Sequence, residues 1–233
     1  MIFNNSLVKE SIIEIEFTEK FDCLICLNAD MPPASLFGAL AGVVVVAADG
    51  AANKLADIGI VPDYIIGDLD SFDISDSRLE GKSKIICNPD QEINDFEKIL
   101  RFANERSYKR LLVTGFHGGE LEHTLNNWSV FMRFARLLNI CIFDKGRYGI
   151  AAAKTFAFKA AANEVISLLP QPAAILTTHN LKWTLNEEEL KLGSREGARN
   201  RATANDVAIE IHSGEVLVFF NSKIPFAPAK PAH

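Results

Sequence analysis

The chain has 233 residues, a length that allows one large domain or two modest ones. Hydrophobic residues make up 48% of it and charged residues 23%, which excludes wholesale disorder and a collagen-like architecture. The 24 Lys and Arg residues face 30 Asp and Glu residues, and the net charge is -6. The chain therefore lacks the positive surface by which proteins bind DNA or RNA, and we expect no nucleic-acid partner.

The apolar segments predict no contact with a membrane. The longest apolar run, residues 36–48, is much shorter than the roughly 20 residues that a membrane-spanning helix needs. The opening MIFNNSLVKE lacks the basic and then apolar pattern of a signal peptide, so we expect a cytoplasmic location. The four cysteines lie in or beside apolar segments, and we expect buried free thiols at Cys23, Cys26, Cys87 and Cys141.

Between residues 21 and 145, short apolar runs alternate with helical patterns. Apolar residues recur at helical spacing over 95–104 and again over 125–138. Such alternation predicts a parallel sheet covered by helices. The expected strands are residues 21–28, 43–49, 62–68, 84–90, 110–116 and 140–145.

After residue 145 the segments become strand-like, without a long amphipathic helix between them. We expect strands within 150–160, 164–170, 173–179, 206–212 and 215–220, with Ser213-Gly214 as a two-residue hairpin turn. The prediction is an α/β N-terminal domain with a mainly parallel, Rossmann-like sheet over residues 1–147, and an all-β sandwich domain over residues 148–233. The proline-containing end, residues 224–233, is expected to be a loose tail.

Polar side chains follow four of the predicted strands. Asp49 ends one strand and Asp68 ends the next, with Asp70 two residues later; Asp95 opens a helix, and His117 follows a later strand. Ligands of open parallel sheets bind beyond the carboxyl ends of the strands, where these residues are expected to meet. Carboxylates packed together repel one another unless a cation lies between them, and two acids on one turn suit Mg²⁺.

Simpler and competing explanations apply to single residues. Asp49 and Asp95 are also good helix N-caps. The acidic run 68–79 lacks the Gly and Glu of an EF-hand, and the histidines lack the spacing of a helical zinc pair. No Walker A sequence and no GxGxxG is present, so a phosphate site would depend on metal and carboxylates.

Several motifs resemble those of the thiamin pyrophosphokinase family, in both halves of the chain. DGAANKLAD at 49–57, PDYIIGDLDS at 62–71 and PDQEINDFEK at 89–98 are similar to three of its motifs in the same order. GGELEHTLNN at 118–127 is similar to a fourth, with Glu120 where the family commonly has Arg and Glu122 where it commonly has Asp. SLLP at 167–170 and LKWTL at 181–185 are typical of its β domain, whereas ARN at 198–200 matches a Ser-Asn pair only at its Asn.

The resemblance implies a Mg²⁺-dependent transfer of pyrophosphate from ATP to the hydroxyl of thiamine, giving thiamine diphosphate and AMP. It also implies a homodimer with the active site at the interface. The catalytic and metal-binding candidates are Asp49, Asp68, Asp70 and Asp95. The ATP-binding candidates are Asn53, Gly118, Gly119, His123, Thr124 and Asn127. The thiamine-binding candidates are Gln91, Asn94, Trp183, Arg199 and Asn200, with an ordinary core position as the alternative for Trp183.

The departures from the family pattern affect charge. Glu120 in place of Arg removes a cation that would face the phosphates, and the sequence does not rank its possible replacements, Lys54, Lys98, Arg195 and Arg199. Arg199 beside a cationic thiazolium would be unfavourable, so we expect it to face phosphate or solvent.

Other functions fit parts of the sequence. The segment Asp68-Leu69-Asp70 after an apolar strand also occurs in phosphatases that use the first Asp as nucleophile, although two strands precede it here. A pyrophosphokinase for another acceptor alcohol and a non-catalytic binder of thiamine or nucleotide are further alternatives. The nucleotide product of a reaction with ATP distinguishes among them.

Overall fold

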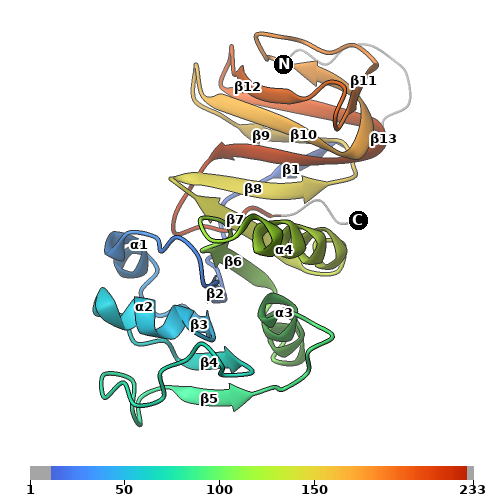
Figure 1. The fold of residues 1–233 in the computed structure, drawn as a ribbon. Coiled ribbons are helices and arrows are strands. Elements are labelled where there is room, and N and C mark those ends of the chain that lie inside the picture. Colours follow the sequence, from blue (N-terminus) through green and yellow to red (C-terminus); the bar gives the residue numbers. More distant parts are fainter. Residues whose placement is uncertain (1–11, 230–233) are drawn as a thin grey trace. The chain divides into compact units, whose positions relative to one another are not determined.

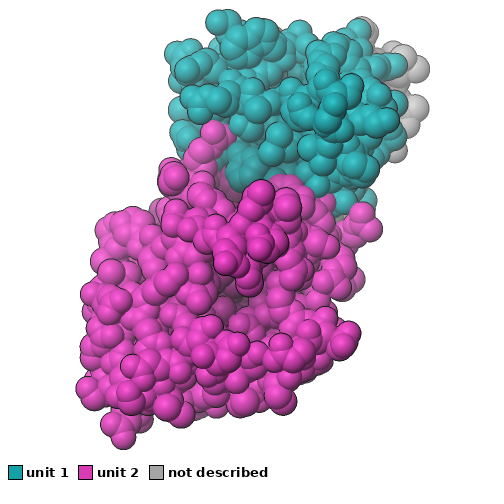
Figure 2. All heavy atoms as spheres, in the orientation of Figure 1, with its two compact units in different colours: residues 1–16, 151–221, 229–233 teal, residues 17–150, 222–228 magenta. Residues whose placement is uncertain are grey.

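The computed structural model describes residues 12–229, and these form two compact units (Figure 2). Unit 2 consists of Phe17–Ile150 and Ser222–Pro228. Unit 1 consists of Ala151–Asn221 together with residues 12–16 and 229. A single division between residues 147 and 148 therefore does not describe the chain, because one short segment near each end belongs with the unit formed by the other half of the sequence.

Unit 2 is built on a parallel sheet (Figure 1). The strand order is β7-β6-β2-β3-β4-β5, and all neighbours in this order are parallel. The six expected strands are thereby confirmed. Their bounds are β2 Cys23–Cys26, β3 Val44–Ala48, β4 Tyr64–Gly67, β5 Lys84–Cys87, β6 Arg110–Thr114 and β7 Asn139–Asp144; β8, Arg147–Ala152, pairs with β7 in the antiparallel direction.

Four helices connect these strands, with α1 and α2 on one face of the sheet and α3 and α4 on the other (Figure 1). They are α1 Ala34–Ala39, α2 Ala51–Asp57, α3 Asp95–Glu105 and α4 Leu121–Phe134. The helix expected over 95–104 is confirmed, whereas the one expected over 125–138 begins and ends earlier as α4. The apolar pattern of 125–138 continues into turns in which Leu137 and Leu138 both donate to the Phe134 carbonyl. No helix within residues 12–229 is long and apolar enough to cross a membrane.

Unit 1 is all β and sandwich-like. Its longest strands, β10 Val165–His179 and β13 Asp206–Asn221, pair in the antiparallel direction along most of their length. Strand β10 also pairs with β11 Glu188–Lys191 and β12 Gly197–Arg201, while β13 pairs with β9 Phe156–Lys159, which is parallel to β1 Ile13–Ile15. The all-β character expected from the sequence is confirmed.

The expected hairpin at Ser213-Gly214 is wrong. Residues 206–221 form one strand, and Gly214 pairs with Ala174 of β10 beside two shifts in register. Gly214 has φ +81°, and a Cβ there would lie 2.1 Å from the Ala173 carbonyl oxygen. Glycine is therefore needed for a bulge inside a long strand and not for a turn.

The expected loose tail is also wrong where the structure describes it. Residues 222–228 pack in unit 2, where the amide of Ala227 donates to the Glu19 carbonyl and the Tyr148 hydroxyl donates to the Phe226 carbonyl. Ala227 is 2% exposed. The prolines leave residues 222–228 without a helical or strand-like pattern of apolar residues. Hydrogen bonds to residues distant in the sequence nevertheless fix this segment. Residues 230–233 lie outside the described chain.

Three of the four cysteines agree with the expectation of buried thiols. Cys23, Cys26 and Cys141 are buried and free, but Cys87 is exposed. Cys87 ends β5, the outermost strand of its sheet, and most of that strand is exposed. An apolar run therefore did not imply burial at the sheet edge.

The bulge at Gly214 predicts a specific loss of stability. Gly214→Ala is expected to lower the free energy of unfolding by more than about 2 kcal/mol, because the new methyl group adds a steric clash to an unfavourable φ. Gly193→Ala is the control, since Gly193 has φ +78° with open space around it. That variant is expected to lose only about 1 kcal/mol. Equal losses in denaturant unfolding of the two variants would contradict the role given to the Ala173 carbonyl.

Candidate active site

A cavity of about 730 Å³ lies in unit 2 at the carboxyl ends of the parallel strands. Its walls come from the segments after β2, β3, β4, β5 and β6 and from the first two turns of α3 and α4. This is the edge at which the sequence analysis placed the polar residues. The parallel direction of the strands brings these segments together although they are far apart in the sequence.

Asp49 is the most buried acid of the cavity. It follows β3 with φ +35°, its amide donates to the Ile66 carbonyl of β4 at 3.0 Å, and the residue is 3% exposed. Its Oδ2 accepts from the Ser71 amide at 3.1 Å, whereas its Oδ1 is buried with no hydrogen-bond partner among the described residues. Burial raises the pKa of Asp49 to about 6, the Ser71 amide opposes this rise, and the neighbouring carboxylates of Asp70 and Asp95 add to it.

Asp68 directly follows β4. Its Oδ2 accepts from the Gln91 side-chain amide at 2.6 Å, and this bond lowers the pKa of Asp68 below its ordinary value. Lys98 contributes a smaller lowering by its charge. Asp68 is therefore an anion held in place by a neutral donor.

Asp95 is the first residue of α3. The preceding Asn94 caps the helix by accepting the Glu97 amide at 2.9 Å, a standard way to satisfy the first turn. The Asp95 Oδ1 accepts from the Lys98 ammonium at 3.0 Å. Burial raises the pKa of Asp95, and the bond to Lys98 opposes this rise.

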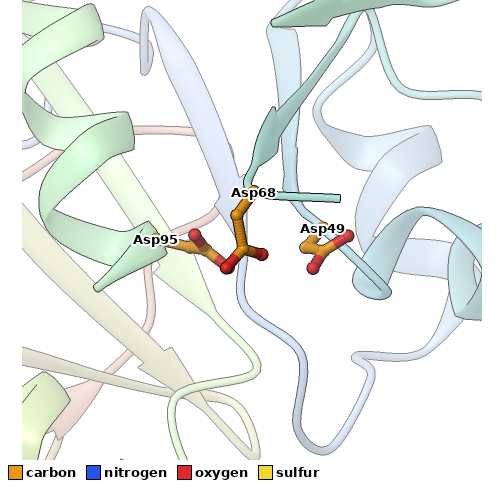
Figure 3. A group of neighbouring side chains, drawn as sticks. All are labelled: Asp49, Asp68 and Asp95. Carbon is orange, nitrogen blue, oxygen red and sulfur yellow. The ribbon is translucent and has the colours of Figure 1, made fainter. Parts of the chain in front are cut away.

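These three carboxylates converge, as Figure 3 shows. One oxygen of each lies within 4.8 Å of the others. Oxygens bound to one octahedral Mg²⁺ ion lie about 3 Å apart when adjacent and about 4.2 Å apart when opposite, so the three carboxylates would draw closer together around an ion. The Oδ1 of Asp49 is a buried acceptor with no hydrogen-bond partner among the described residues, and a bound cation would stabilise its charge. The donor set therefore fits a hard divalent cation such as Mg²⁺.

Asp70 does not belong to this group of three. It lines the same cavity but is exposed, and its Oδ1 accepts from the Ser71 hydroxyl at 2.9 Å. Leu69 between the two acids has φ +70°, so the chain turns sharply after Asp68. The carboxylates grouped with that of Asp68 are those of Asp49, after β3, and Asp95, at the start of α3, whereas Asp70 contributes its backbone amide, which donates to the Asp68 Oδ1 at 3.4 Å.

Gly67 permits the close approach of the three acids. A Cβ at this residue would lie 2.8 Å from the Asp49 Cβ and 3.2 Å from the Asp95 Oδ2. A glycine inside a strand is typical of a place where other groups approach the backbone closely. Its position directly before Asp68 carried this signal, which the sequence analysis did not use.

Helix α3 is tied to α4 by a buried acid. The Glu97 side chain is 4% exposed and accepts from Arg101 and, on α4, from Arg133, each at 2.6 Å. In a second link, the Asn94 side-chain amide donates to the side-chain Oδ1 of Asn127 at 3.0 Å. The clamp holds the first turn of α3, which carries Asp95. Nothing in the sequence distinguished Glu97 from a surface acid.

The ATP-binding candidates are only partly at the cavity. Gly119, His123, Thr124 and Asn127 line it. Asn53 does not; its side chain holds the loop after β4 by bonds to Asp73 and Asp76. Gly118 does not line it either, and a Cβ at Gly118 would lie 2.1 Å from the Asp30 carboxyl carbon. Asn53 thus holds a loop by hydrogen bonds and Gly118 lies against Asp30, and ATP binding by the six candidates stays a prediction.

The thiamine-binding candidates are divided between the units. Gln91 and Asn94 line the cavity of unit 2, whereas Trp183, Arg199 and Asn200 belong to unit 1. Trp183 is 56% exposed, which contradicts a core position, and the Lys182 ammonium lies 4.9 Å from its ring centroid. Asn200 is buried and bonds the Trp183 backbone in both directions. Arg199 is exposed, as expected for a group that faces phosphate or solvent.

The chain combines an α/β unit that contains the acidic cavity with an all-β unit. Residues 41–142 match the family model described as thiamin pyrophosphokinase, catalytic domain. Residues 155–217 match the model described as thiamin pyrophosphokinase, vitamin B1 binding domain. The chain belongs to the thiamin pyrophosphokinase family.

Curated relatives and solved structures agree with this assignment. The chain is 26% identical over 168 residues to thiamine pyrophosphokinase 2 of Arabidopsis thaliana, a match that covers 65% of this chain and 62% of the relative. It is 26% identical over 179 residues to thiamine pyrophosphokinase 1 of Oryza sativa subsp. japonica, covering 64% and 67%. The fold is similar to that of thiamin pyrophosphokinase from Candida albicans, with TM-score 0.75 at 17% identity over 92% and 94% of the chains. For the Bacillus subtilis enzyme the TM-score is 0.70 at 19% identity, over 86% and 99%.

The glycine before Asp68 generates a prediction for metal binding. Gly67→Ala is expected to weaken Mn²⁺ binding by about tenfold or more, because the new methyl group separates Asp49 from Asp95. Gly38→Ala in α1 is the control, since a Cβ at Gly38 has nothing within 4 Å. Calorimetric titration of both variants with Mn²⁺ measures the effect. Wild-type affinity in the Gly67 variant would show that this glycine does not set the carboxylate spacing.

The raised pKa of Asp49 predicts a conflict between stability and metal binding. An acid whose pKa is raised by folding costs stability above the folded pKa, and the cost disappears as pH falls below the unfolded value. Without metal at pH 8, Asp49→Asn is therefore expected to raise the free energy of unfolding by about 1–3 kcal/mol. The gain should shrink between pH 6 and pH 4, and Mn²⁺ binding should be lost. Denaturant unfolding over this pH range measures the effect, and a variant less stable than wild type at pH 8 would contradict it.

Proposed function

We propose that the protein transfers the pyrophosphoryl group of ATP to the hydroxyl of thiamine, giving thiamine diphosphate and AMP. The observation that carries the proposal is the group of Asp49, Asp68 and Asp95, with its partnerless buried oxygen, in a cavity of about 730 Å³. Membership of the thiamin pyrophosphokinase family supports the substrates. The cavity volume is within the range of small-molecule sites.

The three clustered acids are the proposed holders of Mg²⁺. A bound Mg²⁺ ion would neutralise phosphate charge and orient the oxygens of the transferred group. The chain supplies donors to each acid: the Ser71 amide to Asp49, the Gln91 side-chain amide and the Asp70 backbone amide to Asp68, and the Lys98 ammonium to Asp95. These bonds hold the carboxylates before any ligand arrives, so little reorganisation is needed.

The proposed reaction is an in-line displacement at the β-phosphorus. The thiamine oxygen forms a bond to this phosphorus, the bond from the β-phosphorus to the oxygen of AMP breaks, and the hydroxyl proton passes to a carboxylate. Asp70 is the proposed acceptor of that proton, because it lines the cavity outside the group of three. Asp49 is the alternative acceptor.

Further parts of the proposal concern the wider assembly. We infer a Rossmann-like description for unit 2, supported by its parallel strands and by helices on both faces of its sheet. Trp183, exposed in unit 1, is the proposed stacking surface for the flat rings of thiamine. A homodimer with the site at its interface is proposed from family membership.

The test is to incubate the purified protein with ATP, Mg²⁺ and thiamine, and to identify all products by chromatography and mass. We expect AMP and thiamine diphosphate in equal amounts, and neither of them when thiamine is left out. The same reaction is run with Asp68→Asn, in which a neutral amide of the same size replaces an acid that holds the proposed metal. We expect this variant to keep its fold and to lose at least about a thousandfold in rate. Circular dichroism checks the fold.

Other products would decide among the alternatives. AMP without thiamine diphosphate, in the presence of other alcohols, would indicate a different acceptor, for which Arg199 is the hint in the sequence. Hydrolysis of phosphate esters without ATP would favour a phosphatase with Asp68 as nucleophile. Thiamine or nucleotide binding without turnover would indicate a binding protein.

A further inference from the structure

The cavity has an extreme imbalance of charge. Among its described lining residues are six acids, namely Asp49, Asp68, Asp70, Glu92, Asp95 and Glu120. Lys98 is the one Lys or Arg that lines it. A polyphosphate that enters this cavity is repelled by the acids, so its binding requires every available positive charge.

The Lys98 side chain is placed in an unusual way for a lysine. It is only 3% exposed, although it belongs to the first turns of a helix that faces the cavity. Its ammonium donates to the Asp95 Oδ1 at 3.0 Å, and this is the one side-chain hydrogen bond that it makes to residues 12–229. An ammonium has three donors, so two remain for a ligand.

A buried lysine is costly unless its charge is used. Removing an ammonium from water costs several kcal/mol, and a single carboxylate partner repays this only in part. Lysines are rarely buried without such a reason. The location of Lys98 at the wall of an acidic cavity supplies a reason, since its remaining donors can bind an anion that a divalent cation also holds.

The other cations that the sequence offered do not themselves line the cavity. Lys54 is exposed and donates to the carbonyls of Asn28 and Ala29, two residues of the cavity wall, at 3.2 and 3.4 Å. Arg195 is paired with Glu188 at 2.6 Å in unit 1, and Arg199 is exposed in the same unit. None of the three lines the cavity. Within unit 2, the lining of the cavity therefore favours Lys98 over Lys54.

We propose that the Lys98 ammonium binds the phosphate oxygens of the nucleotide, in place of the arginine that Glu120 replaces. The inference rests on the proposed function, because it assumes a polyphosphate ligand. In this structure the Lys98 ammonium forms an ion pair with the Asp95 carboxylate. If a bound cation shared the Asp95 charge, the remaining N–H groups of the Lys98 ammonium would donate to oxygens of the phosphate. Lys98 is thus a substrate-binding residue of the site and not only a structural partner of Asp95.

Two titrations with opposite expected signs test this assignment. Mn²⁺ alone and ATP with saturating Mg²⁺ are titrated into wild type and Lys98→Met by calorimetry. Loss of the ammonium is expected to weaken ATP binding by about 10- to 100-fold, the usual effect of losing a charged hydrogen bond. Mn²⁺ alone is expected to bind at least as tightly as in wild type, because the site becomes more negative.

The control matches the change in net charge. Lys109→Met removes an exposed lysine that precedes β6, at the end of the sheet opposite to the cavity. Both affinities are expected to stay within about twofold of wild type, since a distant surface charge is screened by salt. If Lys98→Met does not fold, Lys98→Gln carries the same test, because the amide still donates to Asp95 without a charge.

Each other outcome overturns the assignment. Parallel weakening of Mn²⁺ and ATP binding would show that Lys98 only keeps the site in shape. Unchanged ATP affinity in a folded variant would show that another group binds the phosphates, while leaving the proposed function intact. Absence of ATP binding in wild type would refute the proposed function and this inference together.

Discussion

The mutual repulsion of three carboxylates is the constraint on which the rest of the structure depends. Asp49, Asp68 and Asp95 bring oxygens within 4.8 Å of one another, and one of these acids is 3% exposed. Such an arrangement costs stability and must be held by the surrounding fold. The buried strands β2, β3 and β4 supply that support. Their backbone hydrogen bonds and packed apolar side chains prevent the carboxyl ends of the strands from separating.

Each acid of the group is held by a donor of a different kind. Asp49 has a backbone amide, Asp68 a side-chain amide and Asp95 an ammonium, and at Asp49 a second oxygen has no partner. One bond fixes the direction of a carboxylate while leaving it able to bind a cation. The Glu97 clamp between α3 and α4 acts one step further out, since it fixes the helix that begins with Asp95. The apo protein thus carries the energetic cost of the site in advance, which favours ligand binding.

The sequence predicted what depends on local pattern and on general rules of parallel sheets. The six strands and the meeting of Asp49, Asp68 and Asp95 follow from alternation and from strand direction. It did not predict what depends on backbone turns and distant partners. The backbone at Leu69 is left-handed, and Asp70 therefore lies outside the group of three. Pairing with a distant strand keeps residues 206–221 in one strand in spite of Gly214. The order of residues 222–228 comes from contacts with Glu19 and Tyr148, which no local pattern reveals.

Charge explains why so negative a cavity can still suit an anionic ligand. Six acids and one lysine line its described walls, so a bare polyphosphate meets repulsion from most directions. A divalent cation, if held by the group of three, would reverse the local sign where the acids are densest, and the Lys98 ammonium beside Asp95 carries a further positive charge. Because Glu120 adds one more acid to the wall, this chain depends more on the cation and on Lys98 than a chain with arginine there. The same negative walls disfavour anions that arrive without a metal, so the imbalance acts as a filter for metal-bound phosphates.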